Sequence, residues 1–193
     1  MGKGRLEAFS DGVIAIIITI MVLELKVPHG YELKDLAPVA PVFAAYVLSF
    51  TYVGIYWNNH HHMFHLVHKV DGGVLWSNLH LLFWLSLTPV TTAWMGENLL
   101  KPMPTALYGF DLLMNGVAYV ILQANLARIE GPDSALVKAK GKDFQGKISP
   151  VLYGVGIVAA FFAPVVSLIA YVAVAFIWVI PDRRVERQLG MTP

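Results

Sequence analysis

Long apolar runs separated by short polar segments extend over the whole chain. A transmembrane α-helix needs about 20 consecutive, mostly apolar residues, and the longer runs reach or exceed that length. Six runs can be distinguished, at about residues 6–27, 36–64, 73–96, 105–129, 148–162 and 164–180. The pattern predicts an all-α membrane protein in which a single domain of six transmembrane helices occupies residues 1–193.

The ends of this pattern need interpretation. No A-x-A-like cleavage site follows the first apolar run, so we expect it to be a retained span and not a signal peptide. The last two runs are short and meet at Ala163-Pro164, where proline permits either a turn or a kink within one helix. One continuous helix would be far longer than the bilayer is thick, which favours two thin spans. An even number of spans places both termini on the same side.

The distribution of lysine and arginine gives the orientation of the predicted helices. If the N-terminus lies inside, only three of the 14 lysine and arginine residues lie in outer segments, at Lys26, Lys34 and Lys101. Eleven lie in inner segments: Lys3, Arg5, Lys69, Arg128, Lys138, Lys140, Lys142, Lys147, Arg183, Arg184 and Arg187. Such an excess is typical of cytoplasmic segments. We therefore expect a multi-pass protein of the cell (plasma) membrane with both termini in the cytoplasm and with membrane lipid around it.

Composition supports the membrane assignment and excludes several classes of function. Hydrophobic residues make up 56% of the chain and charged residues 14%, against roughly 25% charged residues in soluble domains. The chain has no cysteine, which excludes disulfides and cysteine-ligated metals. It also lacks the G-x-S-x-G, H-E-x-x-H and P-loop motifs and a TVGYG filter loop. We expect no enzyme activity, no cofactor, no structural metal and no nucleic-acid partner.

One face of the first predicted helix combines small, bulky and hydroxyl side chains. At 100° per residue these residues share that face: Gly12, Ile16, Thr19, Ile20 and Leu23. Arg5 continues the face toward the cytoplasm, whereas Asp11 lies outside it. Several copies around an axis would form apolar rings with one hydroxyl ring, and such constrictions can gate by dewetting. The alternative is ordinary packing or lipid contact, with Thr19 bonded to a carbonyl of its own helix.

Polar residues gather near the inner ends of the first three predicted helices. We expect Asp11 to lie at about the same depth as His60, His61 and Asn78, and polar groups at one depth should pair because hydrocarbon offers them no partner. Trp76 suits an interfacial belt. The sequence therefore predicts an inner polar cluster of these residues, with either His60 or His61 taking part.

Two other polar features have competing interpretations. One helical face carries three histidines at i, i+4 and i+7, namely His61, His65 and His68, and this spacing is plausible for a metal site. The alternatives are that they sense protons, or that they lie at the membrane interface and bond to water. Asp111 is isolated in the fourth apolar run and could pair with Lys101 or cap a kink.

Several motifs together resemble the transmembrane protein 175 family, the lysosomal-type potassium channels, in its short prokaryotic form. They are Arg5-x-x-x-Phe9-Ser10-Asp11, Trp57-x-Asn59-His60-His61, Trp76-x-Asn78, Phe83-Trp84-Leu85-Ser86-Leu87-x-Pro89 and Trp178-x-Ile180-Pro181-Asp182-Arg183-Arg184. The resemblance covers essentially the whole chain. It implies six helices per subunit and a homotetramer whose first helices line a central pore.

The resemblance also implies roles for individual residues. The constriction positions correspond to Ile16, Ile20 and Leu23, and a selectivity-related threonine corresponds to Thr19, so permeating potassium would pass near Ile16 and Thr19. Arg5 and Asp11 of the first motif, which also contains Phe9 and Ser10, would join a network with a histidine of the second helix and with Asn78 and Trp76.

The favoured interpretation is a passive cation channel that prefers potassium modestly over sodium. One alternative is a proton or proton-coupled cation permease that uses Asp11 and the histidines of the second helix as a relay. Another is a membrane enzyme or metal-binding protein built on the histidine cluster.

Overall fold

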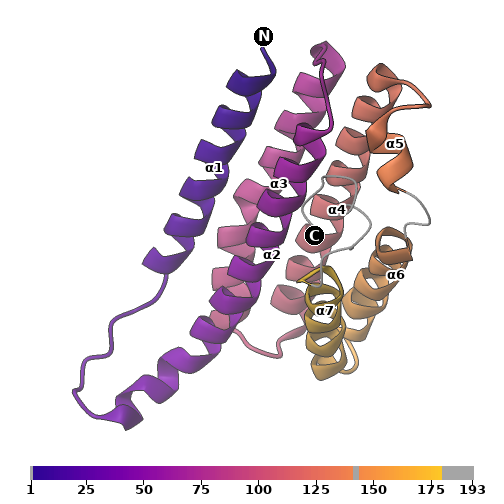
Figure 1. The fold of residues 1–193 in the computed structure, drawn as a ribbon. Helices are drawn as coiled ribbons and strands as arrows, with labels where there is room; N and C mark the ends of the chain where they lie inside the picture. Colours follow the sequence, from indigo (N-terminus) through magenta and orange to yellow (C-terminus); the bar gives the residue numbers. More distant parts are fainter. Residues whose placement is uncertain (1, 141–143, 180–193) are drawn as a thin grey trace, which may run out of the picture.

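The computed structural model describes residues 2–140 and 144–179, and all regular structure in these two segments is helical. Figure 1 shows a bundle of long helices, with α1 (Lys3–Leu23) at one edge and the pair α6 (Phe144–Ala159) and α7 (Pro164–Val179) at the other. The expectation of an all-α protein is confirmed. Ile180 and the proline-aspartate-arginine motif after it, together with Lys142, lie outside the described residues.

The connection from α1 to α2 (Ala40–His65) shortens both predicted helices. α1 ends at Leu23 and not at residue 27, and Pro28 disfavours helical backbone in the residue before it. A 3-10 helix, η1 (Leu33–Val39), takes the place of the first turn predicted for the second helix. Its N-terminus is closed by a capping box between Glu32 and Asp35.

α3 (Gly72–Glu97) and α4 (Pro102–Glu130) form an antiparallel pair in the middle of the bundle. The Asp71 side chain begins α3 by accepting a hydrogen bond from the Val74 amide at 2.9 Å. Pro102 begins α4, since the first turn of a helix needs no proline N–H. Gly131, with φ of 90°, ends it in a conformation that disfavours a side chain.

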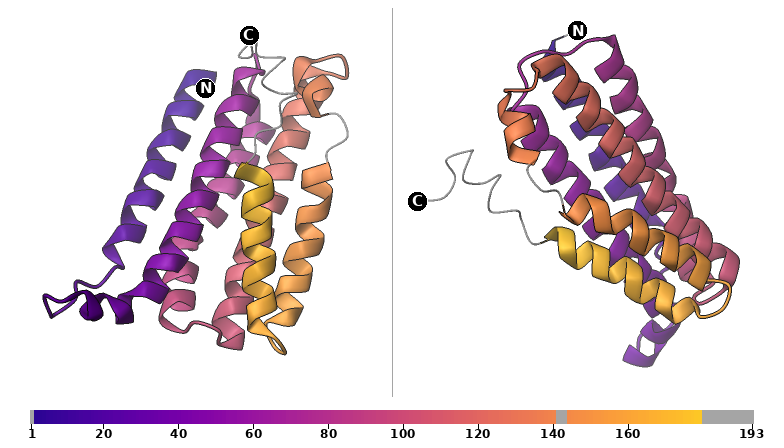
Figure 2. Two further views of the ribbon diagram at one scale, coloured as in Figure 1. Left: turned by 60° about the horizontal axis from the view of Figure 1, so that its bottom comes forward. Right: turned by 90° about the vertical axis from the view of Figure 1, so that its right-hand side faces the viewer.

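The C-terminal part of the described chain is a helical hairpin that packs against α2 and α4. α6 and α7 lie side by side in both views of Figure 2 and turn around the Ala163-Pro164 joint, which is a turn and not a kink. Tyr171 of α7 is buried against Gly109 and Gly156, where an added Cβ would collide with its ring. A short helix, α5 (Ala135–Lys140), lies in the segment before the hairpin.

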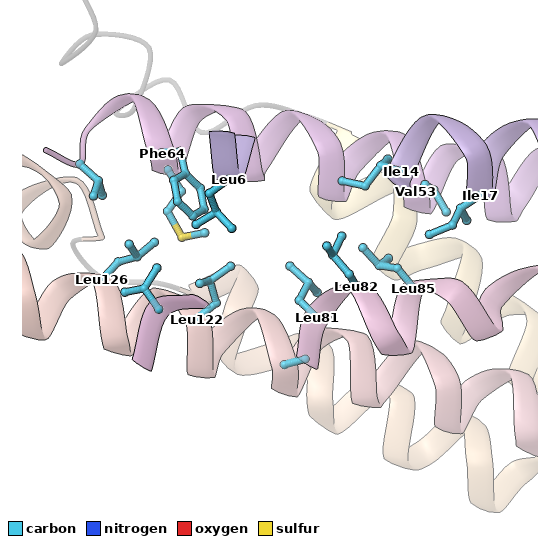
Figure 3. Close-up of a cluster of buried hydrophobic side chains, with 14 of the residues drawn as sticks. Leu6, Ile14, Ile17, Val53, Phe64, Leu81, Leu82, Leu85, Leu122 and Leu126 are labelled. Carbon is cyan, nitrogen blue, oxygen red and sulfur yellow. The ribbon is translucent and has the colours of Figure 1, made fainter. Parts of the chain in front are cut away.

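Apolar side chains fill the space between α1, α2, α3 and α4 (Figure 3). Leu6, Ile14 and Ile17 of α1 are buried there against leucines of α3 and α4, such as Leu81 and Leu122. A second apolar cluster, which includes Tyr171, lies between α2, α4 and the hairpin.

Many large apolar side chains remain on the surface of the described chain, which is expected where lipid or other copies surround it. Three described helical stretches are both long and apolar enough to cross a bilayer: Lys3–Leu23, Leu33–His65 and Pro102–Glu130. The protein is therefore a membrane protein, and six spans stay a prediction.

Candidate functional site

The two faces of α1 have different environments. Five side chains of this helix are buried within the subunit, at positions three or four residues apart: Leu6, Ser10, Ile14, Ile17 and Met21. On the opposite face Ile16, Ile20 and Leu23 are 57%, 43% and 78% exposed. Because α1 stands at the edge of the bundle, its exposed stripe points away from the rest of the chain. We call this stripe the outer stripe, and it consists of Gly12, Ile16, Thr19, Ile20 and Leu23.

Thr19 lies in the middle of the outer stripe. Its hydroxyl donates to the carbonyl oxygens of Ala15 and Ile16, each at 3.0 Å. The hydroxyl hydrogen is thereby turned toward the backbone of α1, as the alternative interpretation of this residue expects. Its oxygen is left exposed as an acceptor, so this position can offer oxygen lone pairs to a cation.

A buried polar cluster joins α1, α2 and α3 on the inner face of α1. The Asn78 amide nitrogen donates to Ser10 Oγ at 2.9 Å, and Ser10 Oγ donates to the Leu6 carbonyl at 2.8 Å. Asn78 Oδ1 lies 2.8 Å from His60 Nε2. Since this oxygen can only accept, Nε2 must carry the hydrogen. Ser10 and Asn78 are 0% exposed and His60 is 1% exposed, so the cluster is sealed inside the subunit.

The sequence left open whether His60 or His61 joins the cluster, and in the structure it is His60 that contacts Asn78. His61 is exposed, and its ring stacks on those of Trp57 and His65 with centroids 6.3 Å apart in each case. The buried cluster of Ser10, Asn78 and His60 is therefore built on one histidine.

Asp11 lies apart from this cluster. Its Oδ1 accepts a hydrogen bond from the Trp57 indole nitrogen at 3.1 Å, near the surface of the subunit. The sequence did not single out Trp57 as a partner of Asp11. The available signal was its indole N–H, which needs an acceptor in an apolar environment.

The other residues expected in the inner cluster face outward. Phe9 is 48% and Trp76 75% exposed, and Arg5 is also exposed. Within the described segments Arg5 forms no ion pair. Of the predicted network, the chain thus brings together Ser10, His60 and Asn78 in its interior. It leaves Arg5, Phe9 and Trp76 on its surface.

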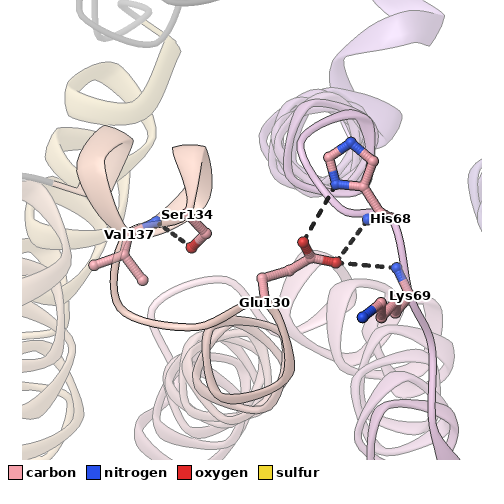
Figure 4. A network of polar contacts seen from close by, with 5 residues as sticks. All are labelled: His68, Lys69, Glu130, Ser134 and Val137. Atoms are coloured by element: carbon pink, nitrogen blue, oxygen red, sulfur yellow. Dashed lines mark hydrogen bonds and ion pairs between the residues drawn. The ribbon is translucent and has the colours of Figure 1, made fainter.

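The histidines at the end of α2 do not converge on a metal site. No group of three or more histidine, aspartate or glutamate side chains among the described residues could hold a metal ion. Figure 4 shows that His68 instead contacts Glu130, at the end of α4. Glu130 accepts from the His68 and Lys69 amides at 2.7 and 3.0 Å, and its other oxygen lies 3.3 Å from His68 Nδ1.

A second polar contact fastens the same end of the bundle. The Arg128 guanidinium lies 2.8 Å from the Asp71 carboxylate at the start of α3. The Val74 amide, together with Arg128, holds the pKa of Asp71 below its ordinary value in spite of the opposing effect of desolvation. Both contacts fix the loop between α2 and α3 to the end of α4. The sequence predicted neither, because each joins segments about 60 residues apart.

Comparisons with known proteins show what this chain is similar to. Residues 5–89 match the family model of the endosomal/lysosomal potassium channel TMEM175. A potassium channel of Chryseobacterium sp. (strain P1-3) is 54% identical over 189 residues, which cover 98% of both chains. The human endosomal/lysosomal proton channel TMEM175 is 38% identical over 81 residues, 36% of this chain and 16% of that protein.

The fold is also similar to a solved structure. It matches the crystal structure of a lysosomal potassium-selective channel TMEM175 homolog from Chamaesiphon minutus, with a TM-score of 0.78 and 30% identity over 94% of this chain and 97% of that one. The family resemblance predicted from the sequence motifs is confirmed by these relatives, which are ion channels and not enzymes. The 54% identity over nearly the whole of both chains, together with the shared fold, places this chain in the TMEM175 family of cation channels.

Proposed function

We propose that the chain forms a homotetrameric cation channel of the plasma membrane that prefers potassium modestly over sodium. Its pore is lined by the outer stripe of α1, with constrictions at Ile16, Ile20 and Leu23 and a ring of hydroxyl oxygens at Thr19. The observation that carries this proposal is the exposure of that stripe on a helix whose opposite face is fixed by buried contacts. The tetramer follows the family resemblance, and both termini lie in the cytoplasm, as the positive-inside distribution predicts.

The chemistry of the outer stripe supports a barrier with modest selectivity between cations. Apolar rings hold water poorly, so a cation that passes Ile16, Ile20 and Leu23 sheds part of its hydration shell. Potassium is more weakly hydrated than sodium, and the barrier therefore penalises sodium more. The exposed oxygen of Thr19, repeated in each subunit, replaces some of the lost water. With so few ligands the preference is modest.

The buried cluster of Ser10, Asn78 and His60 sets the rotation of α1. Its hydrogen bonds join α1 to α3 and α3 to α2, so they hold the buried face of α1 inward and present the outer stripe to the axis. Arg5, Phe9 and Trp76, which are exposed on one subunit, would contact neighbouring copies or lipid headgroups.

The alternative of a proton relay through Asp11 and the histidines has less support. Asp11 is bonded to Trp57, and an indole N–H donates a hydrogen bond without relaying a proton. The partner of His60 is Asn78, an amide that does not titrate. A steady current that reverses at the potassium equilibrium potential without a pH gradient separates a potassium channel from this rival.

Potassium and sodium flux through the purified protein in liposomes tests the lining. In Thr19→Val the ratio of potassium to sodium flux falls, because the oxygen ring is lost. In Ile16→Asn the total flux rises, because a polar ring wets the constriction. Val22→Asn is the matched control, since Val22 is 44% exposed but lies about 110° round the helix from the centre of the stripe.

The expected result for Val22→Asn is wild-type flux. If Thr19→Val and Ile16→Asn both leave the currents unchanged, or if Val22→Asn raises flux as much as Ile16→Asn, the outer stripe does not line the pore.

A further inference from the structure

A second polar site lies inside the subunit, away from α1. Asp111 of α4 is 2% exposed and faces Thr88 and Thr91 of α3, whose hydroxyls donate to its Oδ2 at 2.9 and 3.2 Å. It belongs to a helix long and apolar enough to cross the bilayer, and it lies about 14 Å along that helix from Pro102. An ionisable residue at such a depth is costly unless a partner neutralises it.

Asp111 has no basic partner in the described segments. The ion pairs found there do not include it, so the pairing with Lys101, one of the two alternatives considered from the sequence, is absent. The titratable groups that interact with it electrostatically are tyrosines, Tyr56 of α2 and Tyr108 of α4. Tyrosine cannot balance a carboxylate charge, because its phenol is neutral or negative. No described side chain pairs a positive charge with Asp111, so either a proton or a cation must neutralise this carboxylate.

Two buried oxygen atoms at this site have no hydrogen-bond donor. They are Asp111 Oδ1 and Asn115 Oδ1, and the two residues lie one helical turn apart on α4. The Asn115 amide nitrogen is directed to the Asp111 carbonyl at 3.0 Å and to Thr88 Oγ1 at 3.4 Å. The free carboxamide oxygen therefore points away from those bonds. Buried acceptors without partners are rare, and a bound ion is one explanation for them.

Proline in α3 removes one backbone hydrogen bond close to Thr88. Pro89 lies inside α3, directly after Thr88, and has no N–H to offer to the Leu85 carbonyl one turn earlier. The side chains at this site supply one carboxylate, one carboxamide and two hydroxyls, and every one of these groups offers oxygen as a ligand atom.

We propose that Asp111, Asn115, Thr88 and Thr91 form a binding site for a monovalent alkali cation inside each subunit, separate from the outer stripe of α1. One carboxylate matches one positive charge, whereas a divalent ion would leave a net charge buried. Oxygen ligands suit hard cations. A proton on Asp111 Oδ1 would also neutralise the carboxylate, and the infrared measurement below separates it from a bound cation. The bound ion holds α3 against α4.

Thermal unfolding of the full chain in detergent micelles tests this site. The midpoint is measured at fixed pH in sodium, potassium or lithium chloride and compared with N-methyl-D-glucamine chloride at the same ionic strength. A ligand that binds only the folded state raises the midpoint with its concentration. We expect an alkali cation to do so in the wild type and in the pore variant Thr19→Val, and to have no such effect in Asp111→Asn. An equal cation dependence in Asp111→Asn overturns the proposal.

Asn115→Leu keeps the carboxylate of Asp111 and is the second test of the site, to be used if Asp111→Asn fails to fold. It removes one oxygen ligand and should raise the half-saturating cation concentration at least about tenfold, since even outer partners of bound metals contribute 10- to 100-fold to affinity. A half-saturating cation concentration equal to that of the wild type overturns the proposal. Infrared spectra give an independent result: a protonated carboxyl band in sodium buffer that disappears in Asp111→Asn would show that a proton, and not a cation, occupies it.

Discussion

Replacing Asn78 by alanine isolates the contribution of the buried cluster that fixes α1. The Asn78 side chain donates to Ser10 of α1 and accepts from His60 of α2, and it is 0% exposed. Alanine favours the helix and fits the space, so α3 itself should persist. The substitution therefore removes two contacts between helices with little effect on the helix that carries them.

The expected loss follows from the contacts that remain. Hydrogen bonds between membrane helices contribute about 0.6 kcal/mol each, or about 1.2 kcal/mol for two. His60, at 1% exposure, is left with a buried N–H and no acceptor, which costs about 1–3 kcal/mol. Ser10 adds little, because its hydroxyl still donates to the Leu6 carbonyl. The free energy of unfolding should fall by about 2–4 kcal/mol.

Reversible unfolding by a denaturing detergent in mixed micelles measures this loss. Ser77→Ala is the matched control, since Ser77 is the neighbouring residue, is 5% exposed and bonds only to the carbonyls of Gly73 and Val74 in its own helix. Its removal should cost less than about 1 kcal/mol. If Asn78→Ala is no less stable than Ser77→Ala, the cluster does not anchor α1 and the reasoning fails.

Two further predictions concern other parts of the fold. Because the folded pKa of Asp71 lies below its unfolded value near 3.9, its contribution is complete above that pH and is lost as pH falls through the folded pKa. Denaturation measured against pH should therefore show that Asp71→Ala is less stable than wild type at neutral pH and that this difference in stability disappears in acid. Asp71→Asn is the control, because it keeps the helix cap and loses only the ion pair with Arg128. A difference in stability that does not depend on pH would contradict this reasoning. Gly109→Ala should lower the unfolding free energy by about 1–3 kcal/mol, since the new methyl group collides with Tyr171. Gly154→Ala, which meets nothing within 4 Å, should be neutral or stabilising, and equal effects of the two alanines would refute the close packing.

The inner polar cluster shows where sequence reasoning reaches its limit. Helical periodicity places His60 and His61 at the same depth but 100° apart, and it cannot say which one meets Asn78. That choice depends on the rotation of α2 against α3, which is set by apolar packing along the whole contact. The same packing turns Ser10 inward and Asp11 outward, so Trp57 becomes the partner of Asp11.

The sequence by itself determined the helical membrane character, the family and the residues that share one face of the first helix. These properties depend on composition, motif spacing and the 3.6-residue period, all of which are local in the chain. Only the tertiary structure decided that this face points out of the bundle and that Glu130 bonds to the distant loop at His68. It also decided that Asp111 is buried with no basic partner among residues 2–140 and 144–179. Such facts depend on how helices rotate and pack against segments far away in the sequence, and local patterns carry no record of that geometry.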